Sequence, residues 1–322
     1  MNIKFLKYIL IVTSVFIGFT SFGKRENRIE ISNGKIIVSI DLEVGGRIME
    51  YSLNGNNVLF NREIGNELQS GPDGGRCDFG PEKLVPPRPE TWLGNWELVE
   101  KKSNYIKIKS QVAKEAGVYL IREFILDENT SHLSFTQTIT NVSDTKKRYC
   151  HWSRTFGEVH GICLAPLNRN SRFPKGYMVY TGANELDYSP EDGINERIRE
   201  GVLEIVGPPE NAKIITDGSD GWLAYITKDN QLFIKKFEVF PEKIYGEMTG
   251  ATVSIWYNKE GICEIEPIGP WEWIVPGKSI SFTENWYLME YKYPKDKKAN
   301  LKEIKNLISI LFLIFLYYLA RV

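Results

Sequence analysis

From Arg28 onward the sequence consists of short runs in which apolar and polar residues alternate, and turn residues close each run. Alternation with a period of two is typical of strands that bury one face. Asn54-Gly55 lies between two such runs and predicts a tight hairpin, because both residues tolerate positive φ. The pattern predicts about a dozen strands. They include the runs 105–109, 119–126, 132–140, 222–227, 232–237, 252–257, 263–266 and 279–289.

That is more strands than one compact sheet comfortably holds, so we expect an all-β fold of two large antiparallel sheets packed face to face. Helical signals are scarce. Ser189-Pro190-Glu191 predicts a short helical turn that runs to Arg199, and Asn300 predicts the start of a C-terminal apolar helix. No linker or repeat divides the chain, so residues 24–294 are expected to form one domain whose loops carry the site.

Both ends of the chain are apolar. Residues 1–23 carry two lysines before an apolar run and small residues where a signal peptidase cuts, which predicts a signal peptide; the alternative is an uncleaved anchor. The protein is therefore expected to be secreted or periplasmic. Residues 295–322 are basic and then apolar. They leave three alternatives open: an anchor that touches or marginally spans a membrane, a helix packed on the domain, or a non-native extension.

Charge and cysteine content limit the partners. The 40 basic and 41 acidic residues form no long block of one sign, so a nucleic-acid partner has no electrostatic support. Cys77, Cys150, Cys163 and Cys263 form no C-x-x-C pair and only three His are present, so neither a metal site nor a cofactor is expected. The thiols are free or paired, and their spacing does not choose among the three connectivities.

The eight Trp and the 12% aromatic content supply flat faces that suit the apolar faces of sugars. Two segments are dense in polar and aromatic residues. The first, 74–92, holds Arg76 and Asp78 in a glycine and proline framework that lets backbone approach a ligand closely. Its alternative is a surface loop with a local ion pair.

The second segment, 263–277, holds Glu264 and Glu266 two residues apart, so both point to one face of a strand. Repulsion between two carboxylates raises one pKa, which favours a proton acceptor or a contact for several sugar hydroxyls. The alternative is a solvated strand face.

A third cluster holds His151, Trp152 and Arg154. Histidine can donate a proton to a departing oxygen, although a structural hydrogen bond is the alternative. The sequence has no G-x-S-x-G elbow and no H-E-x-x-H helix, which excludes the serine-hydrolase and metalloprotease patterns.

In their order and spacing these segments resemble the galactose-mutarotase-like superfamily. Residues 45–48 followed by 54–59 are similar to the opening of aldose 1-epimerases. The segments 74–92, 141–152 and 264–277, followed by Trp286, resemble an uncharacterised bacterial branch of that superfamily, domain of unknown function 4380. The resemblance covers roughly residues 28–291. It implies an antiparallel β-supersandwich whose concave face binds a sugar.

The resemblance also implies a Glu base and a His acid, which carry over to Glu266 and His151. The E-P-x-x-P pattern at Glu266 is similar to the epimerase E-x-x-x-P-D stretch. Glu266 would take the anomeric hydroxyl proton as His151 protonates the ring oxygen, and the opened ring would close on its other face. The further substrate contacts expected on this basis are Glu264, Arg76, Asp78, Trp152, Arg154 and Trp271.

The sequence departs from the epimerase pattern at two places, and these differences leave two functions open. The epimerase N-H-x-Y-F-N-L segment is replaced by Cys150-His151-Trp152-Ser153, and Trp271 stands where the epimerases have Asp. One function is an aldose 1-epimerase-like isomerase. The other is a non-catalytic glycan-binding module or an accessory of a polysaccharide-degrading system. Both functions imply a mono- or oligosaccharide partner. The epimerase hypothesis also requires that His151 and Glu266 face one cavity.

Overall fold

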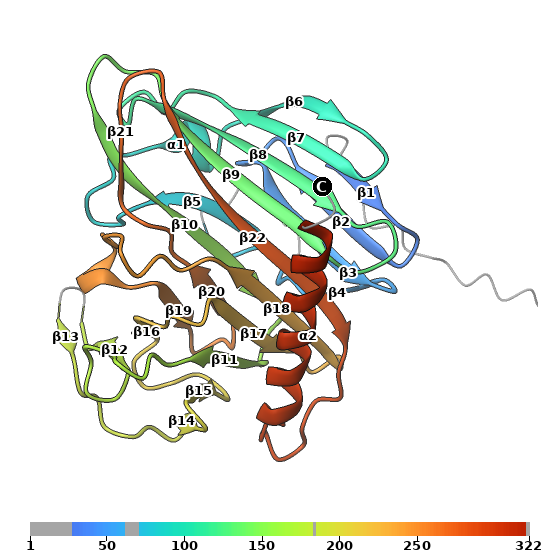
Figure 1. Ribbon diagram of the computed structural model, residues 1–322, viewed down its shortest axis with the longest axis vertical. Helices are drawn as coiled ribbons and strands as arrows, with labels where there is room; N and C mark the ends of the chain where they lie inside the picture. Colours follow the sequence, from blue (N-terminus) through green and yellow to red (C-terminus); the bar gives the residue numbers. More distant parts are fainter. Residues whose placement is uncertain (1–27, 62–70, 183–184, 320–322) are drawn as a thin grey trace, which may run out of the picture.

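The computed structural model describes residues 28–61, 71–182 and 185–319, and it consists of two antiparallel sheets packed face to face (Figure 1). The all-β, two-sheet prediction is confirmed. The predicted signal peptide lies outside the described residues.

Within the described ranges, the first sheet has twelve strands. Its main path runs β1-β2-β3-β5-β10-β20-β19-β16-β12-β13, while β4 pairs with β3 and β21 pairs with β10. Its strands are β1 (Arg28–Ser32), β2 (Ile36–Asp41), β3 (Arg47–Leu53), β4 (Asn56–Asn57), β5 (Gly75–Gly80), β10 (Lys147–Gly157), β12 (Tyr177–Tyr180), β13 (Leu186–Asp187), β16 (Lys213–Thr216), β19 (Val253–Tyr257), β20 (Cys263–Pro267) and β21 (Glu272–Ile274).

In the same part of the chain, the second sheet has ten strands in the order β14-β15-β11-β17-β18-β22-β9-β8-β7-β6. Its strands are β6 (Trp96–Lys101), β7 (Tyr105–Ser110), β8 (Val118–Leu126), β9 (Leu133–Asn141), β11 (Ile162–Pro166), β14 (Glu196–Arg199), β15 (Val202–Ile205), β17 (Trp222–Ile226), β18 (Gln231–Phe237) and β22 (Ser279–Glu290). The described strands outnumber the predicted ones, because very short strands such as β4 and β13 carry no visible alternation.

The Asn54-Gly55 hairpin is confirmed. Asn54 has φ 52° and Gly55 has φ 83°, and Ser52 pairs with Asn57 across the turn between β3 and β4. Both central residues are therefore in the left-handed region that matches the right-handed twist of the flanking strands.

A buried ion pair of the second sheet faces the space between the sheets. Lys235 on β18 and Glu284 on β22 are 0% and 1% exposed, and their Nζ and Oε2 atoms lie 3.0 Å apart. The same ammonium donates hydrogen bonds to the hydroxyls of Ser153 and Thr155 on β10, at 3.0 and 2.9 Å. Because β10 belongs to the other sheet, this lysine ties the two layers together.

The described residues form the helices α1 (Pro89–Trp92) and α2 (Leu301–Leu319) and the 3₁₀ turn η1 (Met248–Gly250). The predicted start of α2 is confirmed, since the Asn300 carboxamide accepts from the Glu303 N–H at 3.3 Å and donates to the Glu303 carboxylate at 3.1 Å. This reciprocal pair is a variant of the capping box.

The helical turn predicted from Ser189 to Arg199 is wrong. Residues 196–199 form β14, which pairs with β15 in register. The Glu204 carboxylate on β15 accepts from Arg197 Nε and Arg199 Nε, each at 2.6 Å. Strand pairing with a buried acceptor therefore outweighs the local capping signal.

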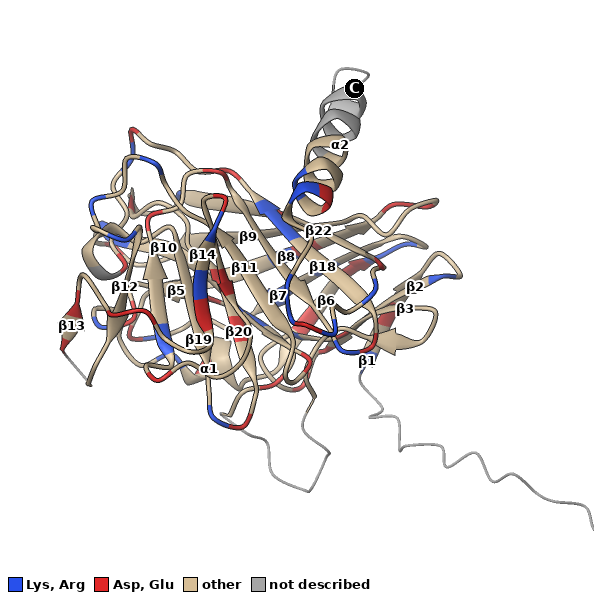
Figure 2. Ribbon diagram, turned by 90° about the horizontal axis from the view of Figure 1, so that it is seen from below, with Lys and Arg blue, Asp and Glu red and all other residues tan. Residues whose placement is uncertain are grey.

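The first turns of α2 pack on the outer face of the second sheet (Figure 2). Leu301, Ile304 and Ile308 are 2%, 0% and 5% exposed and form one apolar cluster with the sheet. Their partners include Ile162, Leu164, Trp222, Ile234 and Tyr287. In the ranges that the structure describes, no helix is both long and apolar enough to cross a membrane.

Candidate functional site

β10 and β20 are neighbours in the middle of the twelve-stranded sheet and place alternate side chains on its open face. On β10, Ser153 and Thr155 point between the sheets, where Lys235 contacts them, so Trp152 and Arg154 point to the open face. There they meet Glu266 and Glu264 of β20, respectively.

Glu264 and Glu266 are buried, with 1% and 0% of each residue exposed. Arg154 Nε lies 2.5 Å from Glu264 Oε1, and Lys213 Nζ lies 2.6 Å from Glu266 Oε1. The Trp152 indole N–H donates to the second oxygen of Glu266. The carboxylate pair is thus held by two cations and an indole, which is not the solvated strand face that the spacing also allowed.

The two carboxyls have different proton affinities. Burial raises the pKa of Glu264 to about 7, although Arg154 opposes this shift and Glu266 adds to it. Burial acts on Glu266 as well, but Lys213 and Arg154 outweigh it and hold the pKa of Glu266 below its ordinary value. Near neutral pH, Glu266 is therefore ionised, whereas Glu264 is present in both its protonated and its ionised form.

A cavity of about 350 Å³ opens over this pair. Its lining includes Glu264, Arg154 and Lys213, whereas Glu266 does not reach it. Trp92 from α1 and Trp256 from β19 provide apolar walls. The cavity thus combines an acceptor, two cationic donors and two flat rings.

Strand register and cation–π contacts fix these walls. Trp256 lies opposite Glu264 on one side and opposite Lys213 on the other. The Trp92 ring has the guanidinium carbons of Arg76 and Arg154 at 4.7 and 5.0 Å from its centroid. Both rings are therefore positioned by contacts within the protein.

Three of the predicted contacts support the cavity without lining it: Trp152, which binds Glu266, and Arg76 and Asp78. Arg76 and Asp78 lie opposite Arg154 and Trp152 on β5, each with 2% of the residue exposed. Arg76 packs on Trp92, and the Asp78 carboxylate accepts from Arg88 Nε at 2.8 Å and from Arg88 Nη2 at 2.5 Å. The ion pair holds the loop before α1 against the sheet.

His151 lies on the opposite face of β10 from Glu266. It is 4% exposed, stacks on Phe282 with ring centroids 5.7 Å apart, and lies 3.5 Å from the Gln137 carboxamide. Burial lowers the pKa of His151 to about 3, so the imidazole is neutral. The expectation that His151 and Glu266 face one cavity is not met. Trp152 is the residue of β10 that faces Glu266, and its neighbour His151 points to the opposite side because adjacent residues of a strand alternate.

Trp271 also lies outside the cavity. Its indole donates to the carbonyl of Arg148 at 3.1 Å, and the Arg148 guanidinium lies 3.8 Å from the ring centroid. The ring also closes over Gly246, where an added Cβ would lie 2.5 Å from it. Trp271 therefore anchors the 240–251 loop.

Sequence reasoning missed Lys213, Trp256, Tyr180 and Glu247. The first three line the cavity and come from strands without a motif. Glu247 is 3% exposed and accepts from the Glu82 N–H at 2.7 Å. Burial raises its pKa to about 7, against that hydrogen bond. Across the described ranges, no group of three or more His, Cys, Asp or Glu side chains is placed to hold a metal ion.

Glu247→Gln is expected to change the pH dependence of stability. A carboxyl group whose pKa rises on folding stabilises the protein below its unfolded pKa and loses that contribution as the pH rises through its folded value, here about 7. Because glutamine does not ionise, the variant should unfold with a free energy about 2 kcal/mol higher than wild type at alkaline pH. Urea denaturation should show this difference vanish in acid. A pH-independent difference, or the same profile in the exposed control Glu97→Gln, would contradict the assignment.

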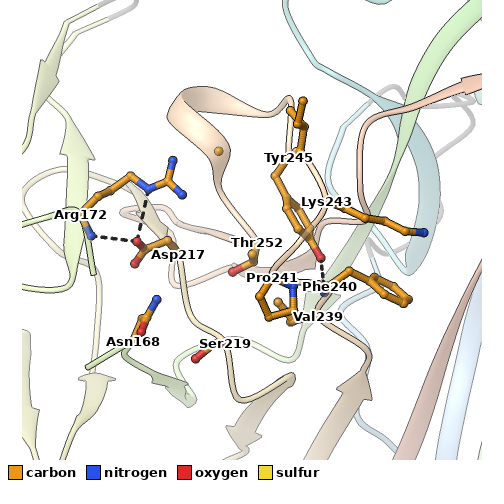
Figure 3. A pocket seen from close by; sticks show the side chains of 12 residues that line it. Asn168, Arg172, Asp217, Ser219, Val239, Phe240, Pro241, Lys243, Tyr245 and Thr252 are labelled. Carbon is orange, nitrogen blue, oxygen red and sulfur yellow. Dashed lines mark hydrogen bonds and ion pairs between the residues drawn. The ribbon is translucent and has the colours of Figure 1, made fainter. Parts of the chain in front are cut away.

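A second cavity of similar size lies between the 168–172 and 239–252 segments (Figure 3). Its polar groups are bound to one another. Asp217 accepts from the Arg172 N–H at 3.0 Å, Arg172 Nη1 donates to the Thr249 carbonyl at 2.7 Å, and the Tyr245 hydroxyl accepts from the Phe240 N–H at 2.9 Å. These contacts hold the surrounding loops together and occupy the polar groups of the second cavity. The cavity over Glu264 is therefore the stronger candidate for a ligand-binding site.

No protein-family model matches the chain, and no curated protein matches it in sequence. Solved structures do match it. A galactose mutarotase-like protein from Lactobacillus casei ATCC 334 has a TM-score of 0.57 at 13% identity, covering 81% of this chain and 100% of that chain. A protein proposed to be an aldose 1-epimerase from Escherichia coli K12 has a TM-score of 0.57 at 11% identity, covering 82% and 99%.

A third neighbour, the galactose mutarotase related enzyme from Lactobacillus acidophilus, has a TM-score of 0.52 at 12% identity and covers 82% of this chain and 98% of that chain. At these identities the likeness shows the fold, which is galactose mutarotase-like. Membership of the uncharacterised branch stays a prediction.

Proposed function

We propose that this protein binds a carbohydrate in the cavity over Glu264, Arg154 and Lys213. The observation that carries the proposal is the combination of a buried carboxylate, two cations and two indole walls around one cavity. A carboxylate accepts hydrogen bonds from sugar hydroxyls, and ammonium and guanidinium groups donate to them. Flat aromatic faces pack on the apolar face of a sugar ring.

The size of the cavity and its charge balance agree with this ligand class. About 350 Å³ is within the range of small-molecule sites and favours one sugar or the end of an oligosaccharide. The two cations are paired with the two carboxylates, so no single sign dominates the floor. The names of the structural neighbours, mutarotase-like and epimerase, point to the same ligand class.

Trp256→Ala tests the binding proposal. Loss of one sugar-facing ring should weaken the affinity for the best glycan of a mono- and oligosaccharide panel by about 10-fold or more, measured by isothermal titration calorimetry. Trp273→Ala is the matched control, because Trp273 belongs to the same sheet but is 55% exposed and lies outside the cavity. Equal affinities for wild type and Trp256→Ala would contradict the proposal.

A second candidate is aldose 1-epimerase-like anomer exchange in the same cavity, favoured by the carboxyl of Glu264 that titrates near pH 7. Glu264 would accept the proton of the anomeric hydroxyl while the C1–O5 bond breaks and the Lys213 ammonium gives a proton to O5. The aldehyde then rotates, and the reverse transfers close the ring. Glu264 takes the role that the resemblance implied for Glu266, because Lys213 and Trp152 occupy both oxygens of Glu266.

Glu264→Gln separates catalysis from binding. If exchange occurs, its rate measured by NMR exchange spectroscopy should rise with pH through about 7 as Glu264 ionises, and Glu264→Gln should lower it by about 100-fold or more. His151→Gln should leave the rate near that of wild type. Exchange that needs His151 but not Glu264 would contradict this mechanism. If no aldose exchanges faster than in buffer alone, this candidate fails, while the binding proposal stands or falls by the Trp256→Ala result.

A further inference from the structure

The first turns of helix α2 have two different faces. The inward positions Leu301, Ile304 and Ile308 are buried against the second sheet. The outward positions Asn306 and Ser309 are polar and exposed. An apolar stripe on the protein and a polar face toward water are typical of a surface helix. These turns therefore need no partner beyond the domain itself.

The polar face stops after Ser309. Ile310 is 53% exposed although it is a large apolar residue. The helix continues to Leu319, and the sequence of 310–319 contains no charged residue and no amide side chain. At a spacing of three or four residues, the outward positions continue with Leu313 and Tyr317. The second half of α2 is thus apolar in sequence on every side, and docking on one sheet can cover only one side of it.

Lysines gather before this apolar stretch. The segment 292–305 contains six lysines and two acidic residues. Five of the lysines are exposed, and the sixth, Lys305, is partly buried and donates to the Glu200 carbonyl at 2.7 Å. Basic residues next to an apolar helix favour the surface of an anionic bilayer, because the lysines meet lipid phosphates while the apolar residues enter the hydrocarbon.

We propose that α2 attaches the protein to the surface of an anionic lipid bilayer, with 310–319 in one leaflet and the lysines of 292–305 at its headgroups. Ten helical residues reach about 15 Å, which is half of the hydrocarbon core, so this stretch enters one leaflet only. Tyr317 and Tyr318 are of a type that favours the headgroup level. The helix therefore lies along the leaflet rather than upright in it.

A second copy of the chain is a poorer partner for the same helix. Two parallel copies of α2 would bring both groups of lysines together, and like charges at close range oppose association. A pair of helices would also cover only the sides that face each other, which leaves apolar residues in water. Lipid phosphates and acyl chains satisfy both the lysines and the apolar stretch.

Membrane attachment through α2 leaves the cavity over Glu264 accessible. α2 packs on the outer face of the second sheet, whereas the cavity opens on the open face of the first sheet. These two faces lie on opposite sides of the sandwich. Attachment is also independent of which ligand the cavity binds.

Vesicle flotation in a density gradient tests the attachment. The full chain is mixed in detergent with phosphatidylcholine vesicles, with or without phosphatidylglycerol, and the detergent is then removed. We expect the full chain to float with the anionic vesicles, and high salt to weaken this binding. The chain truncated after Leu311 should stay at the bottom of the gradient while its Tm remains near that of the full chain. Flotation of this truncated chain with the anionic vesicles to the same extent as the full chain would overturn the proposal.

Charge variants test the role of the lysines. Lys292→Gln/Lys295→Gln/Lys298→Gln should weaken binding to the anionic vesicles by about 10-fold or more, because each lysine near such a surface strengthens binding about fivefold. The matched control Lys101→Gln/Lys102→Gln/Lys114→Gln removes three exposed lysines elsewhere and should bind as the wild type does. Equal losses in the two triple variants would contradict the role of 292–305. A full chain that stays at the bottom, whether as a monomer or joined to its own copies through α2, would also overturn the proposal.

Discussion

A chain that ends at Pro294 should unfold with a free energy at least about 5 kcal/mol lower than the full chain. The truncation removes Leu301, Ile304 and Ile308, which are 2%, 0% and 5% exposed against the second sheet. Each such side chain contributes about 1.5–3 kcal/mol on burial. Denaturant unfolding measures the loss. Stability equal to that of the full chain would contradict the packing of α2 and favour a tail that serves only as an anchor.

The matched control is a truncation after Leu311, which keeps every buried residue of α2 named above and should retain most of the stability. Polar contacts add to the docking of this segment. The Glu204 carboxylate accepts from the Ala299 N–H at 3.3 Å, and Arg199 Nη2 donates to the Ala299 carbonyl at 2.6 Å. Equal losses for the two truncations would place the stabilising contacts beyond Leu311.

Lys235→Met should destabilise the protein by about 3–5 kcal/mol, because it leaves the carboxylate of Glu284 buried without its cation. Lys235 and Glu284 are almost entirely inaccessible to solvent, and their charged atoms lie 3.0 Å apart. The substitution also removes the hydrogen bonds to Ser153 and Thr155, which flank Arg154 on β10. Urea denaturation at neutral pH measures the effect.

Lys235→Met/Glu284→Gln is the matched control, since it removes the uncompensated charge as well as the cation. It should recover a large part of the stability lost in the single variant. A single variant that loses less than about 1 kcal/mol would show that Lys235 stabilises neither its own sheet nor the contact between the two sheets.

Features fixed by local chemistry could be predicted from the sequence. The alternation that predicted strands at 119–126 and 132–140 corresponds to β8 and β9, and the turn chemistry of Asn54-Gly55 and the cap at Asn300 act within a few residues. The error at 189–199 has a non-local cause. Pairing of β14 with β15 and the buried carboxylate of Glu204 are not visible in that segment.

In the candidate site, too, local signals could be predicted from the sequence, whereas contacts between distant strands could not. The spacing of Glu264 and Glu266 placed both on one strand face, and the cluster around Arg154 supplied their partners. Lys213 and Trp256 come from other strands, so only the register of the sheet brings them together. The pairing of His151 with Glu266 followed from the resemblance. Alternation along β10 excludes it, since Trp152 already faces Glu266.

The central claim, that a sugar binds over Glu264, is tested most directly by the indole N–H signals of the eight Trp in a glycan titration followed by NMR. We expect the signals of Trp92, Trp152 and Trp256 to shift, because the first and third line the cavity and the second donates to Glu266. The signals of Trp273 and of Trp286, which is buried between the sheets, should stay in place. A glycan that shifts Trp273 but none of the three, or a full panel that shifts no indole signal, would contradict the claim.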